Sequence, residues 1–229
     1  MHSTILQVKE EEREIRILVL GLDNAGKTTI VRRLCDKPID SIEPTLGFSI
    51  QTLEYDLRDD DGDYDAVGGM SSSSTYQLHL WDIGGQSTIR AYWRNYFEKT
   101  DGIIWVVDSG DRRRLKLVKE ELDLVLEQER LAGASLLVLA NKSDLEGSLG
   151  PQAIARALEL GSNDQDDGTA HESAAAETTN SSQQQQQQHP NHSSRHWTIR
   201  ASSAVTGEGL AESIDWLVRD ITDRIYFAA

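Results

Sequence analysis

Short apolar runs alternate with amphipathic segments along most of the chain. Six runs of six to nine residues have the composition of strands. Several are apolar at consecutive positions, which is the pattern of strands that are covered on both faces. The predicted strands span residues 15–21, 47–55, 76–81, 102–108, 134–140 and 196–201.

Two segments place apolar residues on a single helical face. In residues 207–226 these positions are Leu210, Ile214, Leu217, Ile221 and Ile225. In residues 112–131 they are Leu115, Val118, Leu122, Val125 and Leu126. Strands that alternate with helices predict an α/β fold, here a six-stranded and mostly parallel sheet with helices on both faces.

Two polar stretches interrupt this pattern. Residues 56–75 separate the strands 47–55 and 76–81, which predicts one antiparallel hairpin with a long tip. Residues 162–194 include the run Gln183–Gln188. Neither stretch has enough large apolar side chains to offset the entropy of ordering. We therefore expect two disordered insertions in a single domain that spans residues 1–229.

The charge is concentrated in the same stretches. The chain carries 38 acidic and 23 basic residues, for a net charge of −15. Residues 56–75 hold six acids and one Arg, and residues 162–194 hold five acids and no Lys or Arg. An acidic chain is a poor match for nucleic acid, which attracts basic surfaces. One cysteine, Cys35, excludes an intramolecular disulfide. The expected protein is a cytoplasmic monomer.

The N-terminus is expected to be a small helical extension over residues 1–14. Position 2 is His instead of Gly, so no N-myristoylation is expected if residue 1 is the native start. Only Ile5, Leu6 and Val8 are apolar before the charged residues begin, so the segment is a poor membrane anchor. No run approaches the roughly 18 apolar residues that span a membrane.

Candidate chemistry begins at residues 21–28, Gly-Leu-Asp-Asn-Ala-Gly-Lys-Thr. They follow a predicted strand and begin a helix, as a phosphate-binding loop does. Successive N–H groups of such a loop surround an anion; here they belong to Asp23, Asn24, Ala25 and Gly26. Lys27 would reach the β and γ phosphates, and the Thr28 hydroxyl would bind Mg²⁺. The sequence thus predicts a nucleotide site.

The base is indicated by Asn141-Lys142-Ser143-Asp144, directly after the predicted strand 134–140. Guanine has two donors, N1–H and the amine at C2, which the Asp144 carboxylate would accept together. Against adenine the same carboxylate would face an unpaired acceptor, and such sites reject the wrong partner by roughly 10⁴ or more. Lys142 would lie along the base plane, and Asn141 would tie this loop to the phosphate loop. GTP and GDP are the expected ligands.

A third motif, Trp81-Asp82-Ile83-Gly84-Gly85-Gln86, ends a predicted strand. Asp82 is placed to contact Mg²⁺ through water, Gly85 to bring its N–H against the γ-phosphate, and Gln86 to orient the attacking water. Thr45, in Pro44-Thr-Leu-Gly47, is the second expected Mg²⁺ ligand. The segments around Thr45 and Gly85 would touch only the third phosphate, so its loss would release both.

Together these motifs resemble the Arf and Arf-like branch of the small GTPases, whose patterns stand here at residues 21–29, 44–48 and 81–86. Further stretches, including residues 92–98 and 203–208, resemble the second Arf-like group, which is linked to tubulin-folding cofactors. The likeness implies the P-loop small-GTPase fold. We find no arginine finger within the chain, and a finger supplied by another protein is worth about 10³ to 10⁵ in rate. Slow intrinsic hydrolysis is therefore expected.

The resemblance implies further roles. Ala204, beside Ser203, would offer its N–H to the guanine carbonyl, and Thr29 would contact the α-phosphate. Phe48, Trp81 and Tyr96 match the hydrophobic triad that family members present to effectors in the GTP state, although such aromatics are also common in cores. The hairpin would slide by two residues on nucleotide exchange, which keeps side chains on the same faces.

The implied partners are a tubulin-folding cofactor, carriers of lipidated proteins, and exchange and GTPase-activating factors. The implied location is cytoplasmic and microtubule-associated. Two other interpretations stay open. An ATP-dependent phosphotransferase would need a second substrate site, and Asp144 argues against ATP. A nucleotide-bound scaffold that does not cycle is disfavoured by the intact Gln86 and Thr45. The run Arg112-Arg-Arg is interpreted as a solvated helix start.

Overall fold

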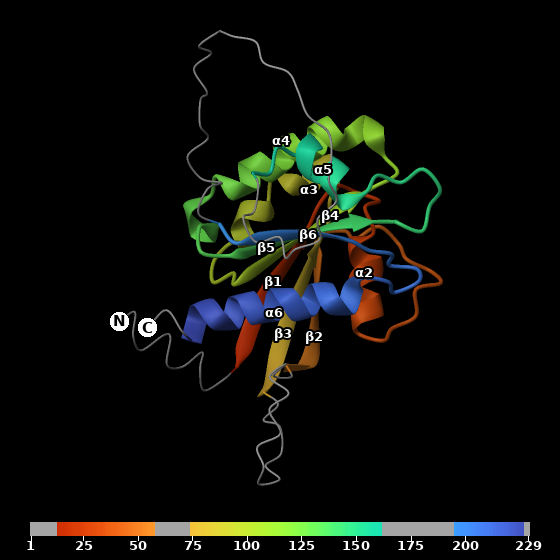
Figure 1. Cartoon of the computed structure of the whole chain (residues 1–229). Coiled ribbons are helices and arrows are strands. Elements are labelled where there is room, and N and C mark those ends of the chain that lie inside the picture. Colours follow the sequence, from red (N-terminus) through yellow and green to blue (C-terminus); the bar gives the residue numbers. More distant parts are fainter. Residues whose placement is uncertain (1–12, 58–73, 162–194, 227–229) are drawn as a thin grey trace, which may run out of the picture.

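A six-stranded sheet runs through the centre of the computed structural model, which describes residues 13–57, 74–161 and 195–226 (Figure 1). The strand order is β2-β3-β1-β4-β5-β6. The strands are β1 (Glu14–Leu20), β2 (Phe48–Leu57), β3 (Ser74–Ile83), β4 (Gly102–Asp108), β5 (Ser135–Asn141) and β6 (Trp197–Ala201). Strands β2 and β3 are antiparallel and the other neighbours are parallel. The predicted sheet and its hairpin are confirmed.

Helices cover both faces of this sheet (Figure 1). On one face lie α2 (Lys27–Leu34) and α6 (Leu210–Tyr226). On the other lie α3 (Ser87–Arg90), α4 (Leu115–Leu126) and α5 (Pro151–Ala157). Short 3₁₀ helices add η1 (Trp93–Tyr96), η2 (Arg112–Arg114) and η3 (Glu129–Leu131).

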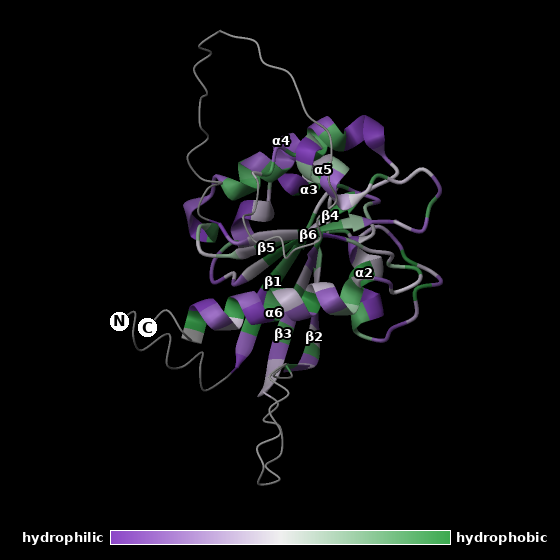
Figure 2. Ribbon diagram, in the orientation of Figure 1, coloured by the Kyte–Doolittle hydropathy of each residue, from purple (hydrophilic) through white to green (hydrophobic). Residues whose placement is uncertain are grey.

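Strand β1 shows why the sheet needs helices on both sides. Its side chains point alternately to the two faces. Ile15, Ile17 and Val19 pack in the core that includes α2 and α6. Leu18 and Leu20 pack in the core that includes α4. Figure 2 shows the hydrophobic positions gathered in the central strands, whereas the helices are striped with hydrophilic ones. A continuous apolar run therefore becomes a strand that is buried on both faces.

The hairpin strands are longer than the sequence predicted. Asp56 pairs with Thr75 and Leu57 pairs with Ser74, although all four residues were assigned to the insertion 56–75. The boundary of the insertion at residues 56 and 75 was wrong, because the composition of a segment does not show which residues pair with another strand. Strand β1 likewise begins at Glu14, inside the expected extension 1–14. Residues 1–12, 58–73 and 162–194, where the rest of these segments falls, lie outside the described residues.

Helix ends also differ from the prediction. The predicted helix 112–131 is divided into η2, α4 and η3. Gln128, with an extended backbone at ψ 117°, separates α4 from η3. The predicted helix 207–226 begins only at Leu210, since Gly207 and Gly209 have φ of 89° and 72°. Helix α5 was not predicted, although Pro151 at its first position is a common start signal.

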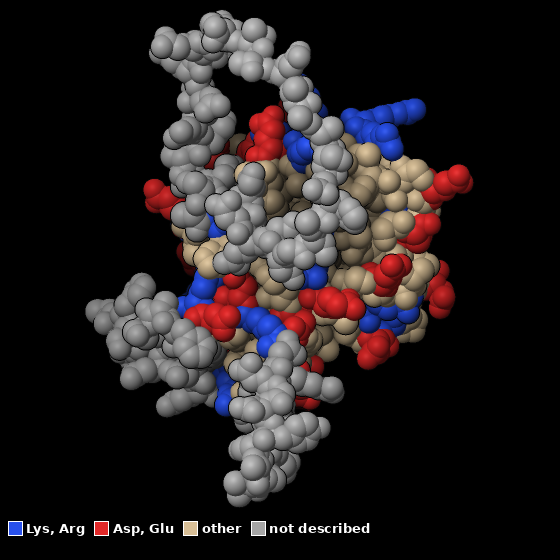
Figure 3. Space-filling view, viewed as in Figure 1, with Lys and Arg blue, Asp and Glu red and all other residues tan. Residues whose placement is uncertain are grey.

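The surface carries both signs of charge. On the face drawn in Figure 3, acidic side chains are interspersed with Lys and Arg. Across the ranges that the structure describes, no helix combines the length and apolar character that crossing a membrane requires.

Candidate functional site

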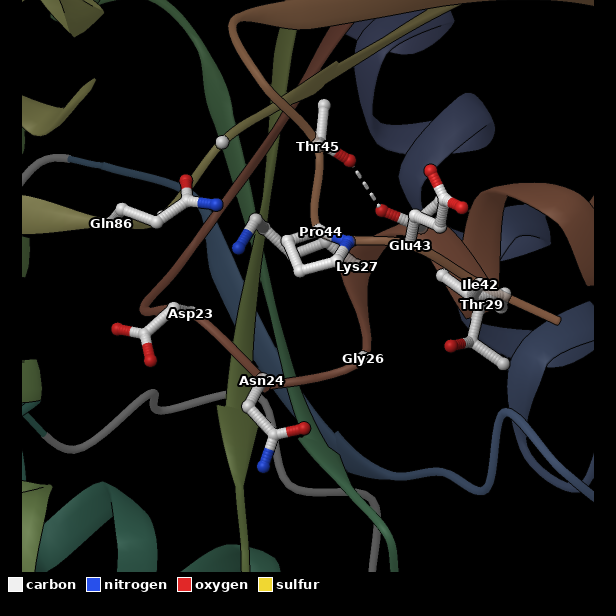
Figure 4. A pocket seen from close by; sticks show the side chains of 13 residues that line it. Asp23, Asn24, Gly26, Lys27, Thr29, Ile42, Glu43, Pro44, Thr45 and Gln86 are labelled. Carbon is white, nitrogen blue, oxygen red and sulfur yellow. Dashed lines mark hydrogen bonds between the residues drawn. The ribbon is translucent and has the colours of Figure 1, made fainter.

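The phosphate loop joins the end of β1 to the start of α2 and borders a cavity of about 370 Å³. Residues from the segments 23–29, 42–45 and 84–86 line this cavity (Figure 4). Of the residues predicted to surround phosphates, Asp23, Asn24, Gly26 and Thr29 line it, whereas Ala25 is buried and is not among them. Three segments that are distant in sequence therefore meet around one cavity.

Gly26 must be glycine for two reasons. Its φ is 99°, a left-handed value that disfavours side chains. A Cβ placed there would lie 2.2 Å from Asn141 Nδ2. The phosphate loop can therefore pack tightly against Asn141, the last residue of β5, only because no side chain intervenes.

Lys27 is held inside the phosphate loop. Its side chain is 6% exposed and Nζ donates to the carbonyl oxygens of Gly21 at 2.9 Å and Leu22 at 2.8 Å. Burial lowers the pKa of Lys27 to about 8, against the opposing attraction of Asp82 and Asp23. An amine that has lost most of its water gains strongly from a nearby anion, so the site favours a phosphate beside Lys27.

Thr28, Thr45 and Asp82 converge at the edge of the cavity. Thr28 Oγ1 donates to Asp82 Oδ2 at 2.7 Å and lies 2.8 Å from Thr45 Oγ1. Thr45 Oγ1 also donates to Asp82 Oδ2 at 3.2 Å. Burial raises the pKa of the Asp82 carboxyl, opposed by the hydrogen bond from Thr28 and by the charge of Lys27.

This cluster fits Mg²⁺. Asp82 is fully buried and, among the described residues, its Oδ1 has no hydrogen-bond partner. A buried carboxylate oxygen without a partner is costly unless a cation or water satisfies it. Magnesium prefers a few oxygen ligands and keeps several waters. The hydroxyls of Thr28 and Thr45 would hold the ion, with Asp82 contacting it through water.

Gly85 and Gln86 complete the phosphate side. A Cβ on Gly85 would lie 2.4 Å from both Asp23 N and Gly21 O, so only glycine lets this segment pack against the phosphate loop. Gln86 lines the cavity, and its buried Oε1 has no partner in the described part of the chain (Figure 4). This oxygen is available to accept a hydrogen bond from water.

Asn141 makes the predicted tie between the two loops. Its Nδ2 donates to Ala25 O at 2.8 Å, and its Oδ1 accepts from Ala204 N at 3.0 Å. The side chain is 1% exposed. Ala204 N–H, which the family likeness assigns to the guanine carbonyl, is thus already bonded within the protein. A guanine contact would require Ala204 to share that N–H.

The other residues that the sequence predicts near guanine are Lys142, Asp144 and Ser203. They lie at the same edge of the sheet but outside the phosphate cavity. Lys142 Nζ forms an ion pair with Asp108 Oδ2 at 2.6 Å, and Asp144 is exposed. Ser203 is buried and its Oγ accepts from Thr206 N at 3.1 Å, which shapes the neighbouring loop. The structure therefore joins the base side to the phosphate side through Asn141.

Sequence reasoning missed two arginines that support the site. Arg114 was interpreted as part of a solvated helix start, but its Nη1 donates to Asp23 Oδ2 at 3.2 Å and its Nε to Asp111 Oδ2 at 2.6 Å. That interpretation was wrong for Arg114. Arg33 Nε donates to Ala204 O at 3.2 Å, and its Nη2 donates to Val205 O. No local pattern indicated either contact, because each joins distant segments.

The three aromatics of the expected effector surface form one cluster. The ring centroids of Phe48 and Trp81 are 5.6 Å apart and stacked, and Tyr96 lies 5.1 Å from Phe48. Phe48 is 46% exposed. The guanidinium carbon of Arg16 lies 3.9 Å from the Trp81 ring centroid, a cation–π contact that the sequence did not predict. The effector role of this cluster remains a prediction.

Proteins of known family resemble this chain over nearly all of its length. Residues 1–221 match the ADP-ribosylation factor family. The chain is 46% identical over 224 residues to "ADP-ribosylation factor-like protein 2" of Arabidopsis thaliana, covering 98% of this chain and 96% of the relative. It is 45% identical to the protein of the same name from Drosophila melanogaster, with the same coverage.

Among the solved structures that share the fold is that of the Arl6 BBS3 small GTPase from Trypanosoma brucei with the bound nucleotide analogue GppNp. The TM-score is 0.64 and the sequences are 24% identical, over 91% of this chain and 98% of the other.

Proposed function

This chain belongs to the ADP-ribosylation factor family and is a GTPase, and on that premise we propose that it is a molecular switch whose GTP-bound form recruits effectors. The observation that carries the proposal is the meeting of Thr45 with Thr28 and Asp82. Thr45 lies in a loop outside the helices and strands. A third phosphate and its metal would hold Thr45 there, and their loss would release it.

The chemistry follows from the groups around the cavity. In hydrolysis, water attacks the γ-phosphorus, the bond to the β-phosphate oxygen breaks, and GDP and phosphate leave. Gln86 would accept a hydrogen bond from the attacking water, and Lys27 would offset charge on the β and γ phosphates. Mg²⁺, which the hydroxyls of Thr28 and Thr45 would hold with Asp82 behind them, would supply further positive charge when bound.

We expect the intrinsic rate to be low. None of the residues that line the phosphate cavity within the described ranges is an arginine. Arg114, the arginine bonded to the phosphate loop, is engaged with Asp23 and Asp111. A transition-state arginine would then come from an activating protein, which raises the rate by about 10³ to 10⁵.

The proposed partners are a tubulin-folding cofactor and carriers that release lipidated cargo, together with exchange and activating factors. What supports them is the likeness to the second Arf-like group, with 45–46% identity to proteins named ADP-ribosylation factor-like protein 2. We propose a cytoplasmic, microtubule-associated protein. The exposed Phe48, stacked on Trp81, offers the apolar surface that such partners would bind.

Two experiments test the switch. A pulldown compares Gln86→Leu loaded with GTP against Thr28→Asn loaded with GDP, and tubulin-folding cofactors should be enriched on the first. Equal recovery from both would favour a scaffold that does not cycle. Competition of GTP and ATP for a bound fluorescent nucleotide addresses the phosphotransferase alternative. Displacement by GTP and not by ATP is expected, and the opposite result would overturn the proposal.

A further inference from the structure

Trp93 makes a hydrogen bond that hydrophobic packing alone does not require. Its indole Nε1 donates to Gly84 O at 2.9 Å, and the side chain is 3% exposed. A buried indole N–H has few partners to choose from. In this structure the Trp93 indole donates to the Gly84 carbonyl, at the border of the phosphate cavity. Gly84 and Gly85 both line that cavity.

The geometry of the peptide unit gives this bond a consequence. Among the described residues there is no cis peptide bond, so the C=O of Gly84 and the N–H of Gly85 point in opposite directions. Because the carbonyl is held toward the core, the N–H is turned away from Trp93. We propose that Trp93 is the positioning residue that aims the Gly85 N–H at the γ-phosphate of GTP. This inference rests on the proposed function and deepens it.

The anchor of this bond is rigid. The Trp93 ring meets the Trp105 ring edge to face, with centroids 5.8 Å apart and an interplanar angle of 88°. Trp105 lies on the central strand β4 and is completely buried. Gly84, by contrast, adjoins Gly85 in the segment that loss of the third phosphate would release. Trp93 therefore holds this segment against the packed core.

Gly84 also connects to the loop that carries Thr45. Its N–H donates to Gly47 O at 2.9 Å, and a Cβ on Gly84 would lie 2.6 Å from Thr45 O. One peptide unit is thus held by Trp93 on its carbonyl side while the preceding one is held by the Thr45 loop. Both segments that would sense the third phosphate depend on the position of Gly84.

The same short helix reaches the aromatic cluster. Residues three apart in a 3₁₀ helix lie on one side, and η1 places Trp93 at its start and Tyr96 at its end. Tyr96 lies 5.1 Å from Phe48. If loss of the bond to Gly84 shifted Trp93, the shift would therefore pass through η1 and Tyr96 to the surface that contains Phe48.

The test compares two tryptophans on opposite faces of the sheet. Trp93→Phe removes the indole N–H and keeps an aromatic ring. Trp216→Phe is the matched control, because Trp216 lies on α6 and packs against the core on the other face of the sheet from Trp93. Affinities for GTP and GDP are measured with Mg²⁺ on the full chain. We expect Trp93→Phe to lower the GTP-to-GDP affinity ratio about tenfold, the value of one buried hydrogen bond. Trp216→Phe should leave the ratio as in the wild type.

The contrary results are distinct. If Trp93→Phe has the wild-type ratio, or weakens GTP and GDP equally, Trp93 is a core residue only and the inference fails. If the wild-type chain binds neither guanine nucleotide, the proposed function itself fails.

A second measurement uses the wild-type chain, so its result does not depend on whether a variant folds. Hydrogen exchange of the Trp93 indole N–H is followed by NMR in the wild-type chain, first with a non-hydrolysable GTP analogue and then with GDP. Slower exchange with the GTP analogue is expected, because that form needs the bond to Gly84. Equal exchange in both forms would overturn the inference.

Discussion

Asn141 and Ala25, 116 positions apart, are joined by a hydrogen bond of 2.8 Å from Asn141 Nδ2 to the Ala25 carbonyl. The same side chain accepts a bond from Ala204 N. One buried amide thus fixes the phosphate loop relative to two loops on the base side.

Asn141→Ala should accelerate GDP dissociation by roughly 10²-fold. The change leaves a buried carbonyl and a buried N–H without partners, each worth about 1 to 3 kcal/mol. Stopped-flow release of a fluorescent GDP measures the rate. Ser143→Ala, in the same loop, is the control and should release GDP at nearly the wild-type rate. Similar rates for both variants would contradict the role of Asn141.

Asp144→Asn should change which base is bound. Asparagine presents a donor and an acceptor where aspartate presents two acceptors, so it loses the pair of bonds to guanine and gains a match to the carbonyl at C2 of xanthine. We expect GTP affinity to fall by about 10²-fold or more and XTP affinity to rise. Competition titrations with both nucleotides measure this change. An unchanged preference for GTP would place the base elsewhere.

Lys27 should make the nucleotide-free protein more stable as pH rises. Its pKa is about 8 in the folded chain against an ordinary value of 10.5, so between these values the unfolded chain holds a proton that the folded chain has lost. The free energy of unfolding then rises by up to about 3 kcal/mol over that range. Denaturant titrations at successive pH values measure the slope. Lys27→Met should flatten it, and an unchanged slope in that variant would be inconsistent with this account.

Gln86→Leu should lower single-turnover hydrolysis by roughly 10²-fold, the usual cost of a misplaced reactant. GTP affinity should stay near the wild-type value, since the side chain acts on water. Phosphate release from preloaded protein measures the rate, with Gln128→Leu in the connection after α4 as a control. Fast hydrolysis by the unaided wild type that persists in Gln86→Leu would remove Gln86 from the mechanism.

Arg33→Met should speed GDP release by about tenfold. The carbonyls of Ala204 and Val205 would lose their donor, and the loop beside Ser203 would loosen. Arg32→Met is the matched control, because Arg32 lies beside Arg33 on α2 but donates to Pro38 O and Ser41 O, away from that loop. Equal effects of the two variants would show that Arg33 acts only through general stability.

Much of the fold could be predicted from sequence because it rests on local patterns. Apolar runs that are buried on both faces identified β4 and β5, and alternation with helices indicated a parallel sheet. Element ends were harder to predict. Asp56 and Thr75 look like parts of a polar insertion until their pairing across the hairpin is seen. Pairing energy depends on a partner that is distant in the chain, which composition does not report.

The site divides in the same way. The ligands of the motifs around Lys27, Thr45, Gln86 and Asp144 could be predicted from sequence. Phosphate, metal, water and guanine each need particular groups at fixed spacing. Arg33, Arg114 and Trp93 carry no such pattern. Their roles come from hydrogen bonds to backbone carbonyls or to carboxylates of other segments.

The sequence by itself determined the layers of the fold, the likeness to a GTPase family and the groups that would face the nucleotide. Only the tertiary structure decided which side chains hold those groups in place. The physical reason is that a hydrogen bond is directional and acts over about 3 Å. Trp93 can therefore support Gly84, and Asn141 can support Ala25, only once folding has set both partners at that distance.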